Sequence, residues 1–151
     1  MPCTQLQELK VKNCIMKPTP MQPEQNSTVR KLSLTCCVCS PLQLLALPIP
    51  SLTELYMTAV IIPSVGQSFW IHLPRLYPNL QHLSVLSCQC NSPTFDDVRL
   101  IATQLPFIKS IRLWVKLLQS EEYKRAEELQ AELKKLPSPI KLEFVELNLK
   151  L

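Results

Sequence analysis

Residues 80–88, LQHLSVLSC, place Leu80, Leu83, Val85 and Cys88 in the order L-x-x-L-x-L-x-x-C. In the middle of this stretch apolar side chains alternate with polar ones. Alternation is typical of a short strand with one buried face, because successive side chains of a strand point to opposite sides. We expect Leu83 and Val85 to face a core, with Leu80 filling that core ahead of the strand. Cys88 falls where the chain turns away, a place that suits a small buried side chain such as cysteine.

The same template can be laid on the chain six times. Its copies are LQELKVKNC from Leu6, VRKLSLTCC from Val29, LTELYMTAV from Leu52, LQHLSVLSC from Leu80, IKSIRLWVK from Ile108 and FVELNLKL from Phe144. Consecutive copies begin 23, 23, 28, 28 and 36 residues apart. The first four spacings fall within the range of about 20–29 residues that leucine-rich repeats show. The pattern predicts an α/β leucine-rich repeat solenoid of five to six repeats, with short parallel strands on the concave face and irregular or helical convex returns.

The cysteine-bearing template, together with returns such as TFDDVRLIATQLPFIKSIRLWV at residues 94–115, resembles the leucine-rich repeats of F-box proteins. The resemblance covers nearly the whole chain and is specific to the repeat class. It implies a module that holds another protein, which in that family is a substrate of a ubiquitin ligase. A ligase scaffold would be a partner only through an F-box elsewhere in the full-length protein, because no segment of this chain reads as one. Similar repeats occur in immune receptors and in ribonuclease-inhibitor-like proteins.

Three of the returns are expected to contain helices, at Ser68–Leu73, Ser92–Leu105 and Ser120–Leu136. The first should stop before Pro74, which lacks the N–H that a helix interior needs. In the second, Thr94 and Asp97 resemble a capping pair. The apolar stripes predict which side chains these last two helices bury: Phe95, Val98, Ile101, Ala102 and Leu105, then Tyr123, Ala126, Leu129, Leu133 and Leu136. The first two returns are rich in proline and are expected to be irregular.

The composition is that of one folded domain. The chain has 151 residues, of which 46% are hydrophobic and 19% charged, with a net charge of +4. These values favour a single domain spanning residues 1–151 and argue against disorder. The chain holds 14 prolines but only one glycine, Gly66, so turns that require a positive φ are expected to be scarce. Neither end carries a recognisable cap, which favours a piece of a longer solenoid or an incompletely capped one.

No stretch reads as a membrane span or as a signal peptide, which favours a cytoplasmic or nuclear protein with reduced thiols. Two cysteine clusters, CCVC at residues 36–39 and CQC at residues 88–90, invite a zinc interpretation. Neither has the C-x-x-C spacing that usually supplies two ligands. They lie two repeats apart, roughly 10 Å at about 4.8 Å per strand. We therefore favour packed thiols over zinc and expect no metal and no cofactor.

Catalytic signatures are also missing from the sequence. The two histidines, His72 and His82, belong to no recognisable nucleophile motif. One glycine cannot build a phosphate-binding loop. The paired carboxylates at residues 96–97 and 121–122 fall at expected helix starts, where the helix dipole accounts for them. The sequence therefore favours a binding protein over an enzyme.

The candidate binding residues are the side chains expected on the concave face of each strand. In three columns along the sheet, these are Glu8, Lys31, Glu54, His82, Ser110 and Glu146, then Lys10, Ser33, Tyr56, Ser84, Arg112 and Asn148, then Lys12, Thr35, Thr58, Leu86, Trp114 and Lys150. Aromatic residues and arginine are enriched at the energetic centres of protein interfaces. We therefore expect a patch that binds another protein, made of Tyr56, His82, Leu86, Arg112 and Trp114, extended towards an acidic partner by Lys10 and Lys12.

Two alternatives remain open from the sequence alone. Trp114 and Leu86 could instead pack against a flanking segment or a neighbouring domain. The chain could also bind nucleic acid or another acidic ligand through a basic face. Acidic residues interrupt that face, however, and the basic residues Lys124 and Arg125 are matched by neighbouring glutamates.

Overall fold

The computed structural model describes residues 6–13, 28–37, 49–60, 69–86, 94–115 and 120–146. They form the strands β1 (Glu8–Lys12), β2 (Lys31–Thr35), β3 (Glu54–Thr58), β4 (His82–Leu86), β5 (Ser110–Val115) and β6 (Lys141–Glu146). Their helices are α2 (Phe69–Leu76), α3 (Phe95–Gln104) and α4 (Ser120–Lys134). In these ranges, no helix is long and apolar enough to cross a membrane.

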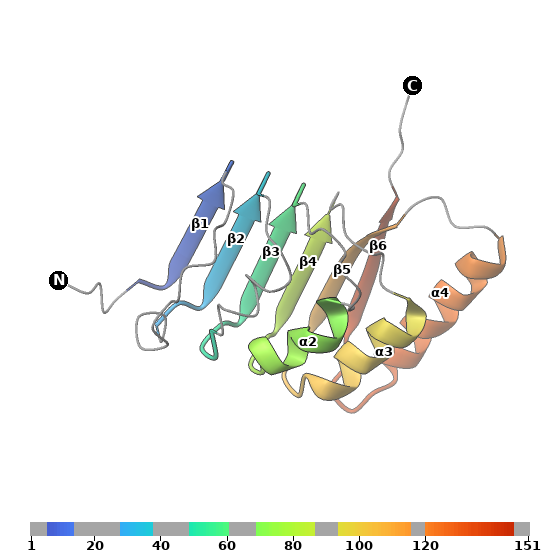
Figure 1. The fold of residues 1–151 in the computed structure, drawn as a ribbon. Helices are drawn as coiled ribbons and strands as arrows, with labels where there is room; N and C mark the ends of the chain where they lie inside the picture. The colour runs from blue at the N-terminus through green and yellow to red at the C-terminus, as the bar shows by residue number, and fades with distance from the viewer. Residues whose placement is uncertain are drawn as a thin grey trace, which may run out of the picture.

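The strands make one open parallel sheet in which each pairs with the next along the chain, in the order β1 to β6 (Figure 1). The register places equivalent residues of each repeat side by side. One row that faces the core is formed by Leu9, Leu32, Leu55, Leu83, Ile111 and Leu142. A second row is formed by Val11, Leu34, Met57, Val85, Leu113 and Phe144. The expected α/β architecture with short parallel strands is therefore confirmed.

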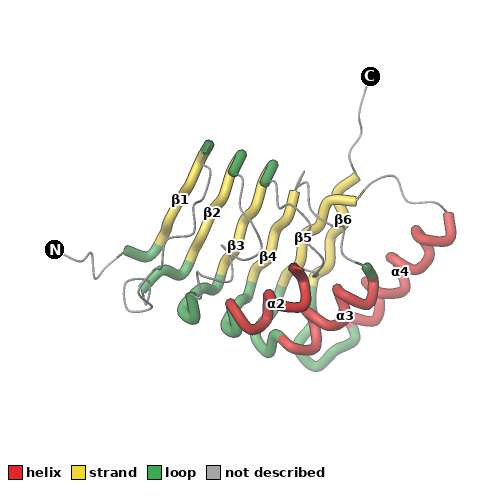
Figure 2. The backbone as a smooth tube through the Cα atoms, viewed as in Figure 1, coloured by secondary structure: helices red, strands yellow, loops and turns green. Residues whose placement is uncertain are grey.

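The helices lie along one side of the sheet, as Figure 2 shows by its red segments beside the yellow strands. Their apolar side chains join those of the strands in one continuous core. Val98 and Ile101 of α3 and Leu129 of α4 are each no more than 1% exposed. The core thus lies between sheet and helices, and the opposite face of the sheet carries the intervening side chains of the strands.

A tight turn with a positive φ follows each of the first three strands. Asn13, Cys36 and Ala59 all have φ 53°. Each N–H donates a hydrogen bond of 3.0 Å to the next strand, with the carbonyl oxygens of Thr35, Thr58 and Leu86 as acceptors. The expectation that such turns are scarce was therefore wrong. The left-handed conformation costs a non-glycine residue roughly 1–2 kcal/mol, and the repeated hydrogen bond to the neighbouring strand offsets it.

The cysteine slot is buried, as the template predicts. Cys37 and its equivalent Val60 are each 0% exposed. The Cys37 thiol also lies 3.4 Å from the carbonyl oxygen of Val11 and 3.3 Å from that of Thr35, so it can donate to either. A cysteine in this slot therefore fills space and can also donate a hydrogen bond to a carbonyl oxygen of its own strand or of the preceding strand. Cys14 and Cys88 lie outside the described residues.

The sixth strand begins five residues earlier than the template predicts. Glu146 was expected to be its first outward residue, yet it is the last residue of β6. Both KLEFVE and FVELNLKL have a period of two, so alternation alone does not choose between them. The structure pairs Leu142 with Ile111 and leaves Leu142 5% exposed. Asn148 and Lys150, the other predicted residues of this strand, lie outside the described residues.

Helix α2 contains Pro74, so the expectation that it ends before this residue was wrong. Proline cannot donate the hydrogen bond to residue i−4, a loss of about 3 kcal/mol or more in a helix interior. Pro74 is itself buried. The segment also buries four large side chains, Trp70, Leu73, Leu76 and Tyr77. Burying each such side chain stabilises the fold by about 1.5–3 kcal/mol, which outweighs the missing hydrogen bond.

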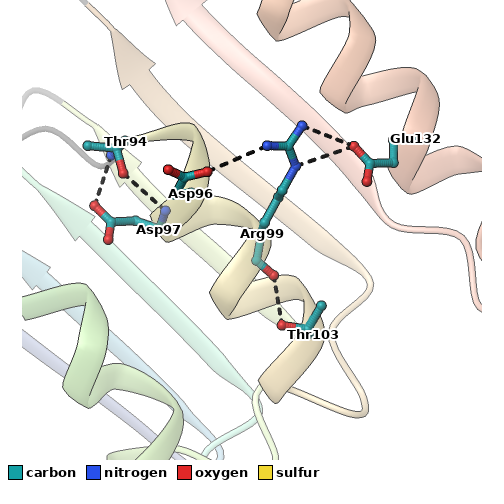
Figure 3. A network of polar contacts seen from close by, with 6 residues as sticks. All are labelled: Thr94, Asp96, Asp97, Arg99, Thr103 and Glu132. Atoms are coloured by element: carbon teal, nitrogen blue, oxygen red, sulfur yellow. Dashed lines mark hydrogen bonds and ion pairs between the residues drawn. The ribbon is translucent and has the colours of Figure 1, made fainter.

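Helix α3 begins with the predicted capping box (Figure 3). The Asp97 N–H donates to the Thr94 hydroxyl at 3.1 Å, and the Thr94 N–H donates to the Asp97 carboxylate at 2.9 Å. Farther along the helix, Arg99 lies between the carboxylates of Asp96, at 3.5 Å, and Glu132 of α4, at 3.3 Å. This exposed network joins α3 to α4. The predicted apolar stripe of α3 is confirmed as part of the core.

Helix α4 buries only part of its predicted apolar stripe. Ala126, Leu129 and Leu133 are buried, but Tyr123 is 49% exposed and Leu136 is 38% exposed. The helix ends at Lys134, so Leu136 no longer follows the helical period. Tyr123 lies near the start of α4, and this part of α4 extends beyond the start of α3 (Figure 1). The prediction for these two side chains was therefore wrong.

Candidate functional site

The face of the sheet opposite the helices has a hollow of about 300 Å³, which we call the open-face hollow. It spans strands β3 to β6 and is lined by Tyr56, Thr58, His82, Leu83, Ser84, Leu86, Ser110, Ile111, Arg112, Lys141 and Glu143. Nine of these eleven are intervening residues of the strands, those that do not join the core rows. Successive rungs of a regular parallel sheet therefore bring them together from segments far apart in the sequence.

Tyr56 forms one wall of the hollow from β3. Its hydroxyl donates a hydrogen bond of 2.9 Å to the carboxylate of Glu54, two residues earlier on the same strand. The ammonium of Lys31 on β2 lies 5.3 Å from the centre of its ring, within range of a cation–π interaction. Burial raises the pKa of Tyr56, and the hydrogen bond to Glu54 and the charge of that carboxylate raise it further. These contacts fix the ring and keep its hydroxyl neutral.

His82 and Ser110 form the floor at one end. The His82 Nδ1 atom lies 2.7 Å from the Ser110 hydroxyl oxygen, across the β4–β5 pair. Beside them, Ser84 is buried, with 8% of its surface exposed. A small side chain in the central column leaves the space that the larger Tyr56 and Arg112 enclose on the neighbouring strands.

Charged groups gather on the β5 and β6 side. The Arg112 guanidinium lies 3.7 Å from the Glu143 carboxylate, and each side chain is 48% exposed. Lys141 lies next to Ser110 in the register and is also exposed. Two cations and one carboxylate leave the hollow with one net positive charge when His82 is neutral. A negatively charged group that entered it would meet Arg112 and Lys141 together.

Four of the seven predicted binding residues line the hollow, namely Tyr56, His82, Leu86 and Arg112. Trp114 lies on β5 but is not among the lining residues. It is half-buried, and its Nε1 atom is buried without a hydrogen-bond partner within the described segments. The predicted patch is therefore brought together without its tryptophan.

Lys10 and Lys12 lie on β1, two strands away from the nearest lining strand. Lys10 forms an ion pair of 3.4 Å with Glu8, which also lies 3.5 Å from Lys31. Partial desolvation acts to raise the pKa of Glu8, but the charges and hydrogen bonds of the two lysines outweigh it and lower that pKa. Lys10, Glu8 and Lys31 therefore form a network of exposed ion pairs outside the hollow, and Lys12 also lies outside the hollow.

The sequence missed Lys141 and Glu143. The reason is that the sixth strand was predicted to start at Glu146, which assigned Glu146 and Asn148 to the outward positions that Lys141 and Glu143 occupy. The sequence did contain a signal for this strand. Polar and apolar residues alternate at the start of KLEFVE, residues 141–146, and this stretch follows the proline that was expected to end the preceding helix. With the register set by Leu142, these two residues fall in the first and central columns.

Metal ligands do not cluster in the part of the chain that the structure describes. In that part, no group of three histidine, cysteine or acidic side chains could hold a metal ion. Cys36 is exposed and Cys37 is buried, and both are free thiols. The remaining members of the two cysteine clusters, Cys39, Cys88 and Cys90, lie outside the described residues.

Comparisons of the chain with models of protein families, with curated proteins and with solved structures gave no match.

Proposed function

We propose that this chain is a leucine-rich repeat solenoid that binds a partner protein, with an acidic side chain of the partner seated in the open-face hollow. The repeat assignment is supported by the recurring rungs: two apolar rows, a buried cysteine slot and the same hydrogen-bonded turn after three strands. Repeats of this kind present one row of side chains per strand on an extended surface.

The observation that carries the proposal is the grouping of Arg112, Lys141 and Tyr56 around one concavity. Arginine and tyrosine are enriched at the centres of protein interfaces. Arginine can also hold a carboxylate through two parallel hydrogen bonds. Leu86 at the rim adds an apolar surface for the residue that follows the acidic one.

The chemistry of the hollow favours a protein over a small molecule or a nucleic acid. Pockets for small molecules are mostly apolar and occupy about 300–1,000 Å³, whereas most residues here are polar and the volume is at the lower end of that range. Nucleic-acid surfaces need clustered positive charge. Here Glu8, Glu54 and Glu143 interrupt the cations of the sheet face.

Panning of a phage library of random peptides on the immobilised chain tests this proposal. We expect the recovered peptides to carry aspartate or glutamate next to an apolar residue. Arg112→Gln with Lys141→Gln should abolish that enrichment, because both cations of the hollow are lost. The control, Arg75→Gln with Lys134→Gln, removes two exposed cations of α2 and α4 and should recover the same peptides.

Recovery of the same peptides by the Arg112→Gln and Lys141→Gln variant would contradict the proposal. The nucleic-acid alternative predicts that the chain instead retains a random-sequence oligonucleotide, with an affinity that falls steeply as salt rises. Recognition of ubiquitin-ligase substrates is a narrower form of the same proposal. It would be supported by an F-box in the full-length protein.

A further inference from the structure

The two edges of the sheet are complementary to each other. In the described part of the chain, β1 pairs only with β2, and β6 pairs only with β5. The backbone groups on the outer side of an edge strand form a template on which another strand can pair. We propose that the β6 edge of one copy of this chain pairs in parallel with the β1 edge of a second copy, so that the sheet continues from one molecule into the next.

The register of the existing sheet sets the alignment. Leu142 pairs with Ile111 and stands in the row that runs back to Leu9. Continuing the same row from one copy to the next places Leu142 beside the second copy's Leu9. The outward residues then meet as Lys141 beside Glu8 and Glu143 beside Lys10. Both of these rungs join opposite charges.

The sheet already forms ion pairs between outward residues on neighbouring strands. Glu8 lies 3.5 Å from Lys31, its register partner on β2. Arg112 lies 3.7 Å from Glu143, its register partner on β6. The proposed contacts between copies repeat this geometry. Glu8, Lys31 and Glu54 are neighbours in one outward row, in which negative and positive charges alternate. Lys141 of another copy, placed beside Glu8, would continue that alternation.

The apolar rows point to the same contact. Leu32 and Leu34, which have a strand on each side, are 2% and 1% exposed. Their register partners on the edge strand, Leu9 and Val11, are only half-buried. Phe144 at the opposite edge is half-buried as well. A second copy would cover Leu9 with Leu142, and Val11 with Phe144, on the side of the sheet that carries the core.

A charge swap tested by sedimentation velocity separates this contact from others. The wild-type chain should associate as its concentration rises and form species larger than a dimer, because a head-to-tail dimer still has one free β1 edge and one free β6 edge. Lys141→Glu sets a second carboxylate against Glu8, and Glu8→Lys sets a second ammonium against Lys141. Each variant alone should associate about tenfold more weakly, the effect of about 1.4 kcal/mol of repulsion. An equal mixture of the two variants should associate like wild type, because opposite charges then meet wherever one variant contacts the other.

Arg75→Glu and Glu121→Lys are the matched controls, because they make the same charge changes at exposed positions of helices. Both should associate like wild type. Far-UV circular dichroism should show that every variant is folded. The mixture is a second check, because mixing would not restore association if either variant had lost it by misfolding. A wild-type chain that stays monomeric at all concentrations overturns the proposal. So does a Lys141→Glu variant that associates as strongly as wild type, since the contact would then avoid the β6 edge.

The two proposals share Lys141, but they are tested by different measurements. Failure of the charge swap leaves the peptide enrichment by Arg112 and Lys141 intact. Loss of that enrichment in the Arg112→Gln and Lys141→Gln variant leaves the restored association of the mixture intact.

Discussion

The guanidinium of Arg112 lies 3.7 Å from the carboxylate of Glu143, its register partner on the neighbouring strand, and each side chain is about half exposed. Exposed pairs of this kind stabilise a fold by roughly 0–1 kcal/mol. Arg112 can therefore exchange Glu143 for the carboxylate of a partner at small cost. Under the proposed function, Glu143 would compete with the acidic side chain of the partner for Arg112.

This competition predicts that Glu143→Gln strengthens binding. The substitution leaves a side chain of the same size but removes the competing charge. An acidic peptide recovered by the wild-type chain should bind the variant several-fold more tightly, an effect of about 1 kcal/mol. Isothermal titration calorimetry at low salt measures it. An affinity lowered by Glu143→Gln would show that Glu143 itself contacts the peptide.

The thiol of Cys37 should contribute to stability beyond its volume. Cys37→Val removes the donor to the carbonyl oxygens of Val11 and Thr35 and keeps an apolar side chain in the slot. We expect the free energy of unfolding to fall by about 1 kcal/mol, measured by urea denaturation. Val60→Cys, the reverse change in the equivalent slot of the next repeat, is the matched comparison. A Cys37→Val variant more stable than wild type would show that the thiol serves packing alone.

The capping box of α3 gives a second stability prediction. Thr94→Ala removes the hydroxyl that accepts from the Asp97 N–H and should destabilise the chain by about 1 kcal/mol. Thr94→Ser keeps the hydroxyl and should remain close to wild type. The melting temperatures of the three proteins measure the difference. Equal destabilisation by alanine and serine would point to the lost methyl group instead of the hydrogen bond.

Tyr56 should make stability depend on pH at the alkaline end. Burial, followed by the hydrogen bond to Glu54 and its charge, raises the pKa of Tyr56 in the folded chain. The resulting stabilisation is complete below the unfolded pKa of about 10 and is lost as the pH rises through the higher folded pKa. Tyr56→Phe cannot titrate, so its free energy of unfolding should fall less steeply above this pH. Urea titrations at several pH values compare the two slopes, and identical slopes would contradict the assignment.

The alternation of apolar and polar residues was enough to locate five of the six strands. The outward residues predicted for β1 to β5 all lie on those strands, because the period of two and the leucine spacing agree there. At β6 two overlapping stretches satisfy the period, and only pairing with β5 selects the one that starts at Lys141. Sequence reasoning therefore missed Lys141 and Glu143, two of the charged groups of the hollow.

The helices show a second limit of local patterns. Pro74 lies inside α2 because burial of its neighbours outweighs a missing hydrogen bond, a balance that propensity alone does not contain. Trp114 was placed in the binding patch because it shares the third outward column with Leu86, yet Leu86 lines the hollow and Trp114 does not. The strand pattern predicts on which face of the sheet a side chain lies. Whether that face is hollow at a given point depends on the sizes of the side chains around it. Here the small Ser84 between Tyr56 and Arg112 decides where the hollow forms.

The central claim, that the open-face hollow binds an acidic partner, is tested most directly by comparing Arg112→Ala with Arg75→Ala. Both substitutions remove one exposed arginine, the first from the hollow and the second from α2 on the other side of the sheet. The measurement is the affinity of the recovered acidic peptide by isothermal titration calorimetry. We predict a loss of at least tenfold, about 1.4 kcal/mol, for Arg112→Ala and no change for Arg75→Ala. Equal affinities for the two variants would contradict the account.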